Sequence, residues 1–218
     1  MFSHWKDIFF KRLRIKGKNN NISYHKNDKG IISINGNNNI VSLPKSAKSF
    51  RLVICGNNNK IIAEDNVLLD KVNINIGKRA YPVENCEILI GKNTFFGQNT
   101  KILIMESNSA LHIGKDCLFA ENANIWCTDA HAILDQKGNA TNIGKSIEIG
   151  DHVWVGMDVK IGKNTQIMKD SIVGWNSVVS RKFDESNVVI AGNPASIVKR
   201  GVSWDEKPVQ VILNQNNK

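Results

Sequence analysis

Aliphatic residues recur every six positions through the C-terminal half of the chain. The column comprises Ile149, Val155, Ile161, Ile167, Val173 and Val179. Glycine follows most of them, and a small or β-branched residue stands four places after each of the first five. A period of six fits neither the 3.6-residue period of an amphipathic helix nor an isolated hairpin. It predicts a solenoid whose coil has three flat faces, with one hexad on each face.

The residue type at each hexad position predicts the direction in which that side chain points. The aliphatic residue points inward, the small residue relieves the corner, and Asn or Asp tolerates the left-handed backbone of the turn. The same phrase appears in residues 90–100 and 113–125. One coil cannot bury its own interior, so coils must stack and pair their backbone groups. The expected fold class is therefore all-β.

Residues 22–76 repeat more loosely. Segment 32–40 (ISINGNNNI) is echoed by segment 52–61 (LVICGNNNKI). These segments predict alternating strands with Asn/Gly corners, and so irregular early coils of the same solenoid. Asn-rich composition also occurs in low-complexity segments, but the apolar alternation argues against disorder.

The two ends of the chain break the pattern. In segment 1–21, Phe2, Trp5, Phe9 and Leu13 lie near helical spacing among basic residues, which predicts a basic amphipathic helix. It would either cover the open end of the solenoid or contact a membrane, and the need of terminal coils for a cover favours the first. The expected solenoid spans 22–182, with an extruded loop near 132–142, and a C-terminal extension follows at 183–218.

Composition narrows the class of protein. A chain of 218 residues with 41% hydrophobic and 22% charged residues suits one packed domain and excludes global disorder. Four cysteines without a CxxC pair favour free thiols in a reducing compartment. We therefore expect a cytoplasmic protein, with peripheral contact at the inner face of the membrane as an option for the basic N-terminus. No apolar run approaches the ~20 residues of a membrane span, and charged residues near the N-terminus exclude a signal peptide.

The net charge of +9 suits an anionic ligand: a CoA phosphate, a nucleotide-linked sugar or an anionic membrane surface. The chain contains no recognition-helix, zinc-finger or RRM-type signature, so no nucleic-acid partner is expected.

Four stretches then carry a resemblance: the hexads of 143–180, Asp-Ala-His-Ala-Ile at 129–133, Val-Trp-Val-Gly at 153–156, and Ala-Gly-Asn-Pro-Ala-Ser-Ile-Val-Lys at 191–199. In these the chain resembles the hexapeptide-repeat acyltransferases, most of all the capsule and lipopolysaccharide O-acetyltransferases and the maltose and galactoside acetyltransferases. The resemblance implies a left-handed parallel β-helix, a homotrimer, and acetyl-CoA bound in a groove between adjacent subunits.

Transfer of an acetyl group from a thioester to a sugar hydroxyl needs a base of near-neutral pKa, and histidine fits best. Among five histidines, His131 stands where the hexads are interrupted by the polar stretch 135–142, and loops on rigid scaffolds carry function. The resemblance also places the catalytic histidine before such a loop. The alternative for His131 is a hydrogen-bonded turn residue. Asp129 would share a face with His131 in an extended strand and orient its imidazole, or it is a turn residue bonded to its own backbone.

Further site residues follow from the resemblance alone. The acetyl-CoA contacts it implies are Trp154, Gly156, Met157, Gly174, Trp175, Ser180, Arg181 and Lys199. Trp154 also suits a purely structural role. Two departures from the family's usual residues stand out. Trp175 replaces a small residue, so it either narrows the groove or stacks on the adenine. Trp126 replaces a polar residue, so we expect it to stack on a sugar face.

Three other functions compete with O-acetylation. A γ-class carbonic anhydrase needs three convergent histidines, and His112, His131 and His152 occupy different hexad positions, so no metal is expected. A non-enzymatic solenoid would show a flat Thr or Ser face without a loop. N-acetylation of a nucleotide-linked amino sugar has a similar base requirement and remains open.

Overall fold

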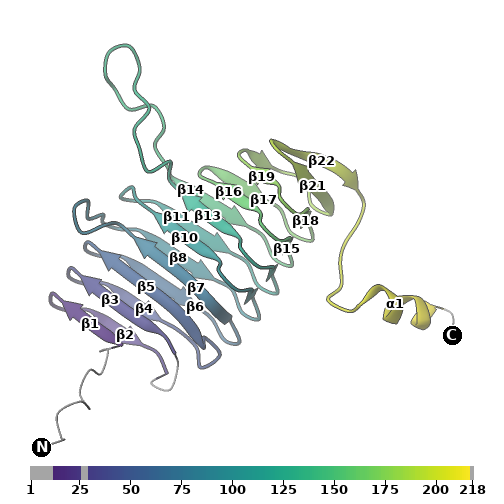
Figure 1. Ribbon diagram of the computed structural model, residues 1–218, viewed down its shortest axis with the longest axis horizontal. Helices are drawn as coiled ribbons and strands as arrows, with labels where there is room; N and C mark the ends of the chain where they lie inside the picture. The colour runs from purple at the N-terminus through teal and green to yellow at the C-terminus, as the bar shows by residue number, and fades with distance from the viewer. Residues whose placement is uncertain (1–11, 26–28, 217–218) are drawn as a thin grey trace, which may run out of the picture.

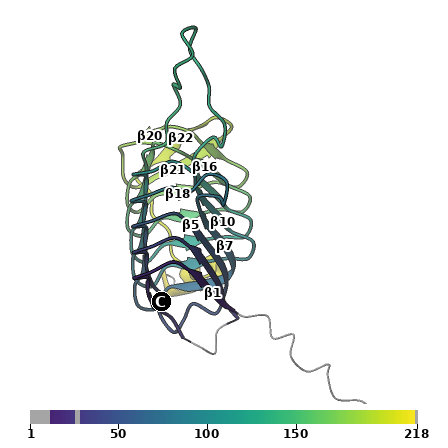
Figure 2. The same ribbon diagram turned by 90° about the vertical axis from the view of Figure 1, so that its left-hand side faces the viewer.

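The computed structural model describes residues 12–25 and 29–216. Most of the predicted N-terminal helix, including Phe2, Trp5 and Phe9, lies outside these residues. The described part of the chain winds into a long solenoid, which Figure 1 shows from the side and Figure 2 shows turned by 90°.

Three faces of parallel strands form the solenoid. Face A consists of β1 (Leu13–Lys16), β3 (Ile31–Asn35), β5 (Ser49–Cys55), β7 (Leu68–Ile76), β10 (Lys101–Ile104), β13 (Asn124–Cys127), β16 (Lys160–Gly162) and β19 (Val178–Val179). Face B consists of β2 (Asn21–Ser23), β4 (Ile40–Ser42), β6 (Lys60–Ala63), β8 (Glu87–Ile90), β11 (Ala110–Ile113), β14 (Ser146–Ile149), β17 (Thr165–Ile167) and β20 (Lys182–Phe183).

Face C begins at residues 68–69 of β7. It continues through β9 (Phe95–Phe96), β12 (Leu118–Phe119), β15 (Trp154–Val155), β18 (Ile172–Val173) and β21 (Val188–Gly192). An antiparallel strand, β22 (Ala195–Arg200), closes this face. The short helix α1 (Val209–Asn216) follows and projects from the end of the solenoid in Figure 1.

The core is built from the columns that the sequence predicts. All six aliphatic residues of the hexad column are buried, and Phe96 stacks on Phe119 in the next coil at 4.6 Å between ring centroids. Removal of these side chains from water is the main stabilising contribution to the fold. Each coil contacts only its neighbours, so this burial is repeated coil by coil along the solenoid. The predicted all-β solenoid is confirmed.

Asparagine fills the corners for two physical reasons. Many corner residues have positive φ, as at Asn122 (61°), and Asn tolerates this conformation better than most residues. Stacked Asn side chains also bond to one another between coils. Asn59 Nδ2 donates to Asn39 Oδ1 at 3.1 Å, and Asn59 Oδ1 accepts from the backbone N–H of Cys86 at 3.0 Å. These bonds satisfy polar groups that would otherwise be buried unpaired.

The strands extend further at both ends than the sequence suggests. Strand β1 lies inside the segment expected to be helical, because Leu13 and Ile15 pair in register with Ile32 and Ile34 and continue their column. At the other end, β20 and β21 complete another coil beyond residue 182, with Phe183 and Ile190 pointing into the core.

Candidate active site

His131 lies at the corner between faces A and B, just after β13. Residues 128–145 leave the solenoid there as a long excursion, which rises above the coils in both views (Figure 1, Figure 2). Ala130 adopts the left-handed conformation (φ 62°), and His131 itself is exposed. Across the described chain, no side chain or backbone group makes a hydrogen bond to the imidazole. Both ring nitrogens are therefore available to a ligand.

Asp129 binds the base of the excursion. Its carboxylate forms an ion pair with Lys163 and accepts a hydrogen bond from Asn142 Nδ2 at 2.7 Å. The same Asn142 amide donates to the backbone carbonyl of His131 at 2.9 Å. The bond from Lys163, followed by that from Asn142, holds the pKa of Asp129 below its usual value. This network fixes the backbone of His131, whereas the predicted contact between Asp129 and the imidazole stays a prediction.

Glu106 and Thr128 support the same corner from below. Thr128 Oγ1 donates to Glu106 Oε1 at 2.7 Å and accepts from the backbone N–H of Ala130 at 2.8 Å. The other oxygen, Glu106 Oε2, is buried and has no hydrogen-bond partner. Burial raises the pKa of Glu106, and the nearby Asp129 charge adds to this effect. Sequence reasoning missed Glu106, Thr128, Asn142 and Lys163.

A groove of about 320 Å³ runs across the outer surface of face A beside this corner. Its walls are Asn124, Trp126, Thr128, Lys160, Ile161, Gly162, Val178, Val179 and Ser180. Trp126, 40% exposed, is the register partner of Gly162, so no neighbouring side chain in β16 stands beside the indole. Thr128 connects the groove to the His131 corner. The structure thus brings together two residues predicted separately, Trp126 and Ser180.

Four predicted acetyl-CoA contacts cluster at the corner between faces C and A. Gly156 and Met157 follow β15, and Gly174 and Trp175 follow β18 one coil later. A Cβ atom on Gly156 would lie 2.4 Å from Trp175 Cδ1, so only glycine leaves room for this ring. Trp175 is 67% exposed, as expected of a ligand-stacking residue rather than a core residue. This corner borders the groove, because the next strand, β16, begins with Lys160, which forms part of the groove wall.

Ser180 lies in the groove, and the last three predicted contacts lie elsewhere on the chain. Trp154 is half-buried on the outer side of face C, 6.1 Å from the ring of Trp204. Arg181 stacks over Phe183 at 5.0 Å, at the next corner after Ser180. Lys199 is exposed on β22. A single chain therefore does not gather the whole predicted set into one site.

Two other histidines, His112 and His152, have protein partners. His112 bridges Glu87 and Glu148 on face B, at 3.1 Å on each side, and His152 Nδ1 lies 3.0 Å from Asp170 Oδ1. No group of three His, Cys, Asp or Glu side chains suited to a metal ion occurs in residues 12–25 and 29–216. Within these ranges, no helix has the length and apolar character of a membrane span.

Cys127, four residues before His131, points into the core. Burial, with the Glu106 charge as a second cause, raises the pKa of its thiol to about 12. The other three cysteines are also free and buried. Cys127 therefore has neither the access nor the ionisation of a nucleophile.

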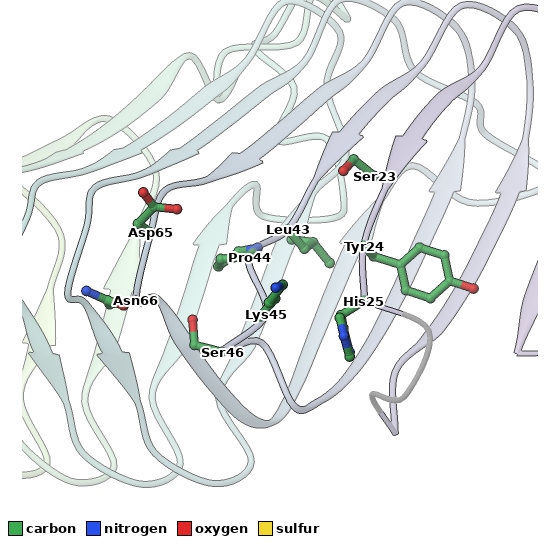
Figure 3. Close-up of a pocket in the computed structure, with 9 residues that line it drawn as sticks. All are labelled: Ser23, Tyr24, His25, Leu43, Pro44, Lys45, Ser46, Asp65 and Asn66. Atoms are coloured by element: carbon green, nitrogen blue, oxygen red, sulfur yellow. The ribbon is translucent and has the colours of Figure 1, made fainter.

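A second and larger hollow, about 720 Å³, lies at the N-terminal end of the solenoid (Figure 3). Tyr24, His25, Lys45 and Asp65 are among its lining residues. It contains none of the predicted site residues and lies several coils away from His131.

Comparison with known proteins supports the fold. The sequence matches no protein-family model and no curated protein. Among solved structures, the polysialic acid O-acetyltransferase OatWY is 29% identical, with 94% of this chain and 98% of that chain covered and a TM-score of 0.77. The polySia-specific acetyltransferase NeuO is 23% identical over 94% and 97% of the two chains, with a TM-score of 0.78.

A hexapeptide-repeat acetyltransferase from Vibrio cholerae, solved with acetyl coenzyme A, is 22% identical over 66% and 72% of the chains, with a TM-score of 0.50. NeuO and the Vibrio protein, both under 25% identical, support the fold alone, whereas OatWY adds sequence identity along almost the entire chain. The structural neighbours of this protein are thus hexapeptide-repeat acetyltransferases, and the left-handed β-helix fold is confirmed. The similarity to OatWY also confirms the acyltransferase class.

Proposed function

We propose that this protein transfers the acetyl group of acetyl-CoA to a carbohydrate hydroxyl, with His131 as the general base. The observation that carries the proposal is the position of His131. Its imidazole is exposed and has no hydrogen-bond partner among the described residues, its backbone is fixed by Asn142, and it lies at a corner next to a groove with an exposed tryptophan. Exposed indoles suit the apolar face of a sugar ring.

In this reaction the acetyl group passes directly from acetyl-CoA to the acceptor. His131 takes the proton of the acceptor hydroxyl as that oxygen attacks the thioester carbonyl carbon. The tetrahedral intermediate collapses with cleavage of the C–S bond. The CoA sulfur leaves and recovers a proton from the imidazolium. No acyl-enzyme is needed, and the buried Cys127 is unsuited to form one.

The corner between faces C and A suits the donor. Gly156 and Gly174 let the backbone approach pantetheine amides closely, and the exposed Trp175 ring suits stacking on adenine. Arg181 and Lys199 would contact the phosphates of acetyl-CoA, and Met157 and Ser180 would flank the bound donor. The Vibrio protein solved with acetyl coenzyme A shares this fold.

A homotrimer would complete the site. The outward residues of face C form an apolar row: Leu68, Phe95, Leu118, Trp154, Ile172 and Val189. Such a continuous apolar row on a surface marks an interface. Packing of a second copy against this row would place Trp154 in the contact between two subunits, which is where the resemblance implies that acetyl-CoA binds.

The acceptor we favour is a surface polysaccharide of the capsule or lipopolysaccharide type, or its precursor, since OatWY and NeuO are polysialic acid acetyltransferases. N-acetylation of a nucleotide-linked amino sugar is the alternative. Free, buried thiols and the use of acetyl-CoA favour the cytoplasm as the place of reaction. Peripheral membrane contact is the option for a basic N-terminus that does not cover the end of the solenoid.

Release of free CoA thiol, measured with acceptors of each kind, tests the proposal. The set should contain polysialic acid, neutral oligosaccharides and nucleotide-linked amino sugars. We expect turnover with a glycan hydroxyl, loss of turnover in His131→Ala, and intersecting double-reciprocal plots. Turnover only with the amino sugar would establish the alternative, and unchanged turnover in His131→Ala would refute the role of the base.

A further inference from the structure

The outer surface of face A carries a regular row of cations and amides. Register pairs Arg51 with Asn73, Asn73 with Lys101, Lys101 with Asn124, and Asn124 with Lys160. The three cationic side chains are exposed and the two amides are half-buried. The row thus alternates charge and amide over five consecutive coils. We call these five residues the basic row.

On face B, by comparison, basic side chains are paired with carboxylates. There Lys60 pairs with Glu87 at 2.8 Å, and His112 bridges Glu87 and Glu148 at 3.1 Å on each side. In the basic row, by contrast, none of the three cations pairs with a carboxylate in the described part of the chain. No Asp or Glu occurs in the face A strands β3, β5, β10, β13 or β16. The acidic residue of β7, Asp70, lies in register with Ser49 and not with a residue of the row. The fold can neutralise a surface column, yet it leaves this one positive.

The spacing makes the row a single electrostatic feature. Adjacent strands lie about 4.8 Å apart, so successive cations stand about 10 Å apart and the row is about 20 Å long. This separation is close to the Debye length of about 8–10 Å at physiological salt, so their potentials overlap. Three like charges in a line repel one another weakly, and an anion that bridges them removes this cost.

The row ends inside the candidate active site. Asn124 and Lys160 form part of the groove wall, and Trp126 stands in the same strand as Asn124. A ligand that follows the row therefore reaches the exposed indole and then the corner of His131. Between the cations, the Asn73 and Asn124 amides can donate to and accept from sugar hydroxyls.

We propose that the basic row binds an acidic polysaccharide along several of its sugar units while one unit occupies the groove beside Trp126. The proposal deepens the proposed function, on which it rests, by naming the class of acceptor. Carboxylates or phosphates spaced along a glycan chain would bridge the cations, and the amides between them would contact hydroxyls. A single sugar or a nucleotide sugar cannot span the row.

Two variants with equal loss of charge test the proposal. Arg51→Gln with Lys101→Gln removes two cations of the basic row that lie outside the groove. Lys92→Gln with Lys115→Gln removes two exposed lysines from the corner between faces B and C, where no site residue lies. Binding of fluorescently labelled polysialic acid is measured directly, with competition by unlabelled polysialic acid, neutral dextran, monomeric sialic acid and single-stranded DNA.

We expect the basic-row variant to weaken polymer binding, and to raise the KM for the polymer, by about tenfold, with a smaller effect at high salt. The control variant should match the wild type, and the kcat for a short acceptor should change in neither variant. Equal effects of the two variants, or equal competition by dextran or DNA, would overturn the proposal.

Direct binding keeps this outcome separate from that of the proposed function. A protein that binds the labelled polymer through the basic row but releases no thiol would refute the acetyl transfer alone. A protein that releases thiol with acceptors of every size, and shows no preference for the charged polymer, would refute the basic row alone.

Discussion

His131 and His152 occupy similar corners of the solenoid and have opposite surroundings. His152 has a left-handed backbone (φ 53°), its ring stacks on Trp204 at 4.5 Å, and its Nδ1 lies 3.0 Å from Asp170 Oδ1. Its carbonyl also accepts a hydrogen bond from Trp204 Nε1 at 2.8 Å. The imidazole of His131 has no such partner in the described chain. The corner of His152 fixes the imidazole ring, whereas the corner of His131 fixes only the backbone.

Coil length explains the difference in polar partners. The coil after His152 is regular, so Asp170 lies 18 residues later and directly beside it. The coil that contains His131 spans 36 residues between neighbours such as Lys115 and Asp151, because the excursion 128–145 is inserted in it. A regular repeat satisfies its corner residues, and an interruption exposes one of them.

The largest effect is expected from His131→Ala. Loss of a positioned general base costs about 10²–10⁴-fold in rate, so turnover should fall by this factor while binding of CoA persists. Stability should change little, since the ring is exposed and makes no hydrogen bond, ion pair or ring stack in the described structure. Steady-state kinetics, CoA titration and thermal unfolding measure these three quantities.

His152→Ala provides the matched contrast. It removes the ring stack and the Asp170 contact, so we expect a loss of about 1–2 kcal/mol in unfolding free energy and near wild-type turnover. Should His152→Ala abolish turnover while His131→Ala spares it, the functional interpretation of the two corners would have to be reversed.

The hexads predict most of the scaffold because each column depends only on residue type at a fixed spacing. Strand β1 escaped prediction because Leu13 continues a helical spacing with Phe9 in the sequence, while its partner Ile32 belongs to another coil. His131 could be found because the interruption is visible in the sequence. Its supports could not, since Glu106 and Lys163 reach Thr128 and Asp129 across 22 and 34 residues, through coils of unequal length.

Gly156→Ala should have the next largest effect. The added Cβ would lie 2.4 Å from Trp175 Cδ1 and 2.9 Å from the carbonyl oxygen of Val173, so the exposed indole must move. We expect the KM for acetyl-CoA to rise by about tenfold, which corresponds to about 1.4 kcal/mol of lost binding. In Gly162→Ala the nearest atom lies at an ordinary 3.5 Å, so its thermal unfolding should match the wild type. An unchanged KM in Gly156→Ala would exclude Trp175 from the donor site.

Thr128→Val tests the support beneath the His131 corner. The substitution keeps the side-chain shape and leaves the Ala130 N–H and Glu106 Oε1 without their partner. We expect a loss of about 1–3 kcal/mol in stability and a fall in kcat of a few fold, as the His131 backbone loses one of its constraints. Thr128→Ser restores the hydroxyl and should recover both. If serine does not recover kcat, the bond to Glu106 has no part in positioning His131.

The smallest effect is expected at Cys127, although it lies nearest to His131 in sequence among the cysteines. A covalent route would require its thiolate, but burial raises the pKa of this thiol to about 12, and the Glu106 charge adds to that effect. At pH 8 the ionised fraction is therefore about one in ten thousand. Its side chain also points into the core, where acetyl-CoA has no path. Cys127→Ala should retain turnover, and the native protein should react with a thiol reagent only after it unfolds. An acetyl mass on Cys127 after exposure to acetyl-CoA without acceptor, together with ping-pong kinetics, would contradict direct transfer and would give the interrupted corner a nucleophile as well as a base.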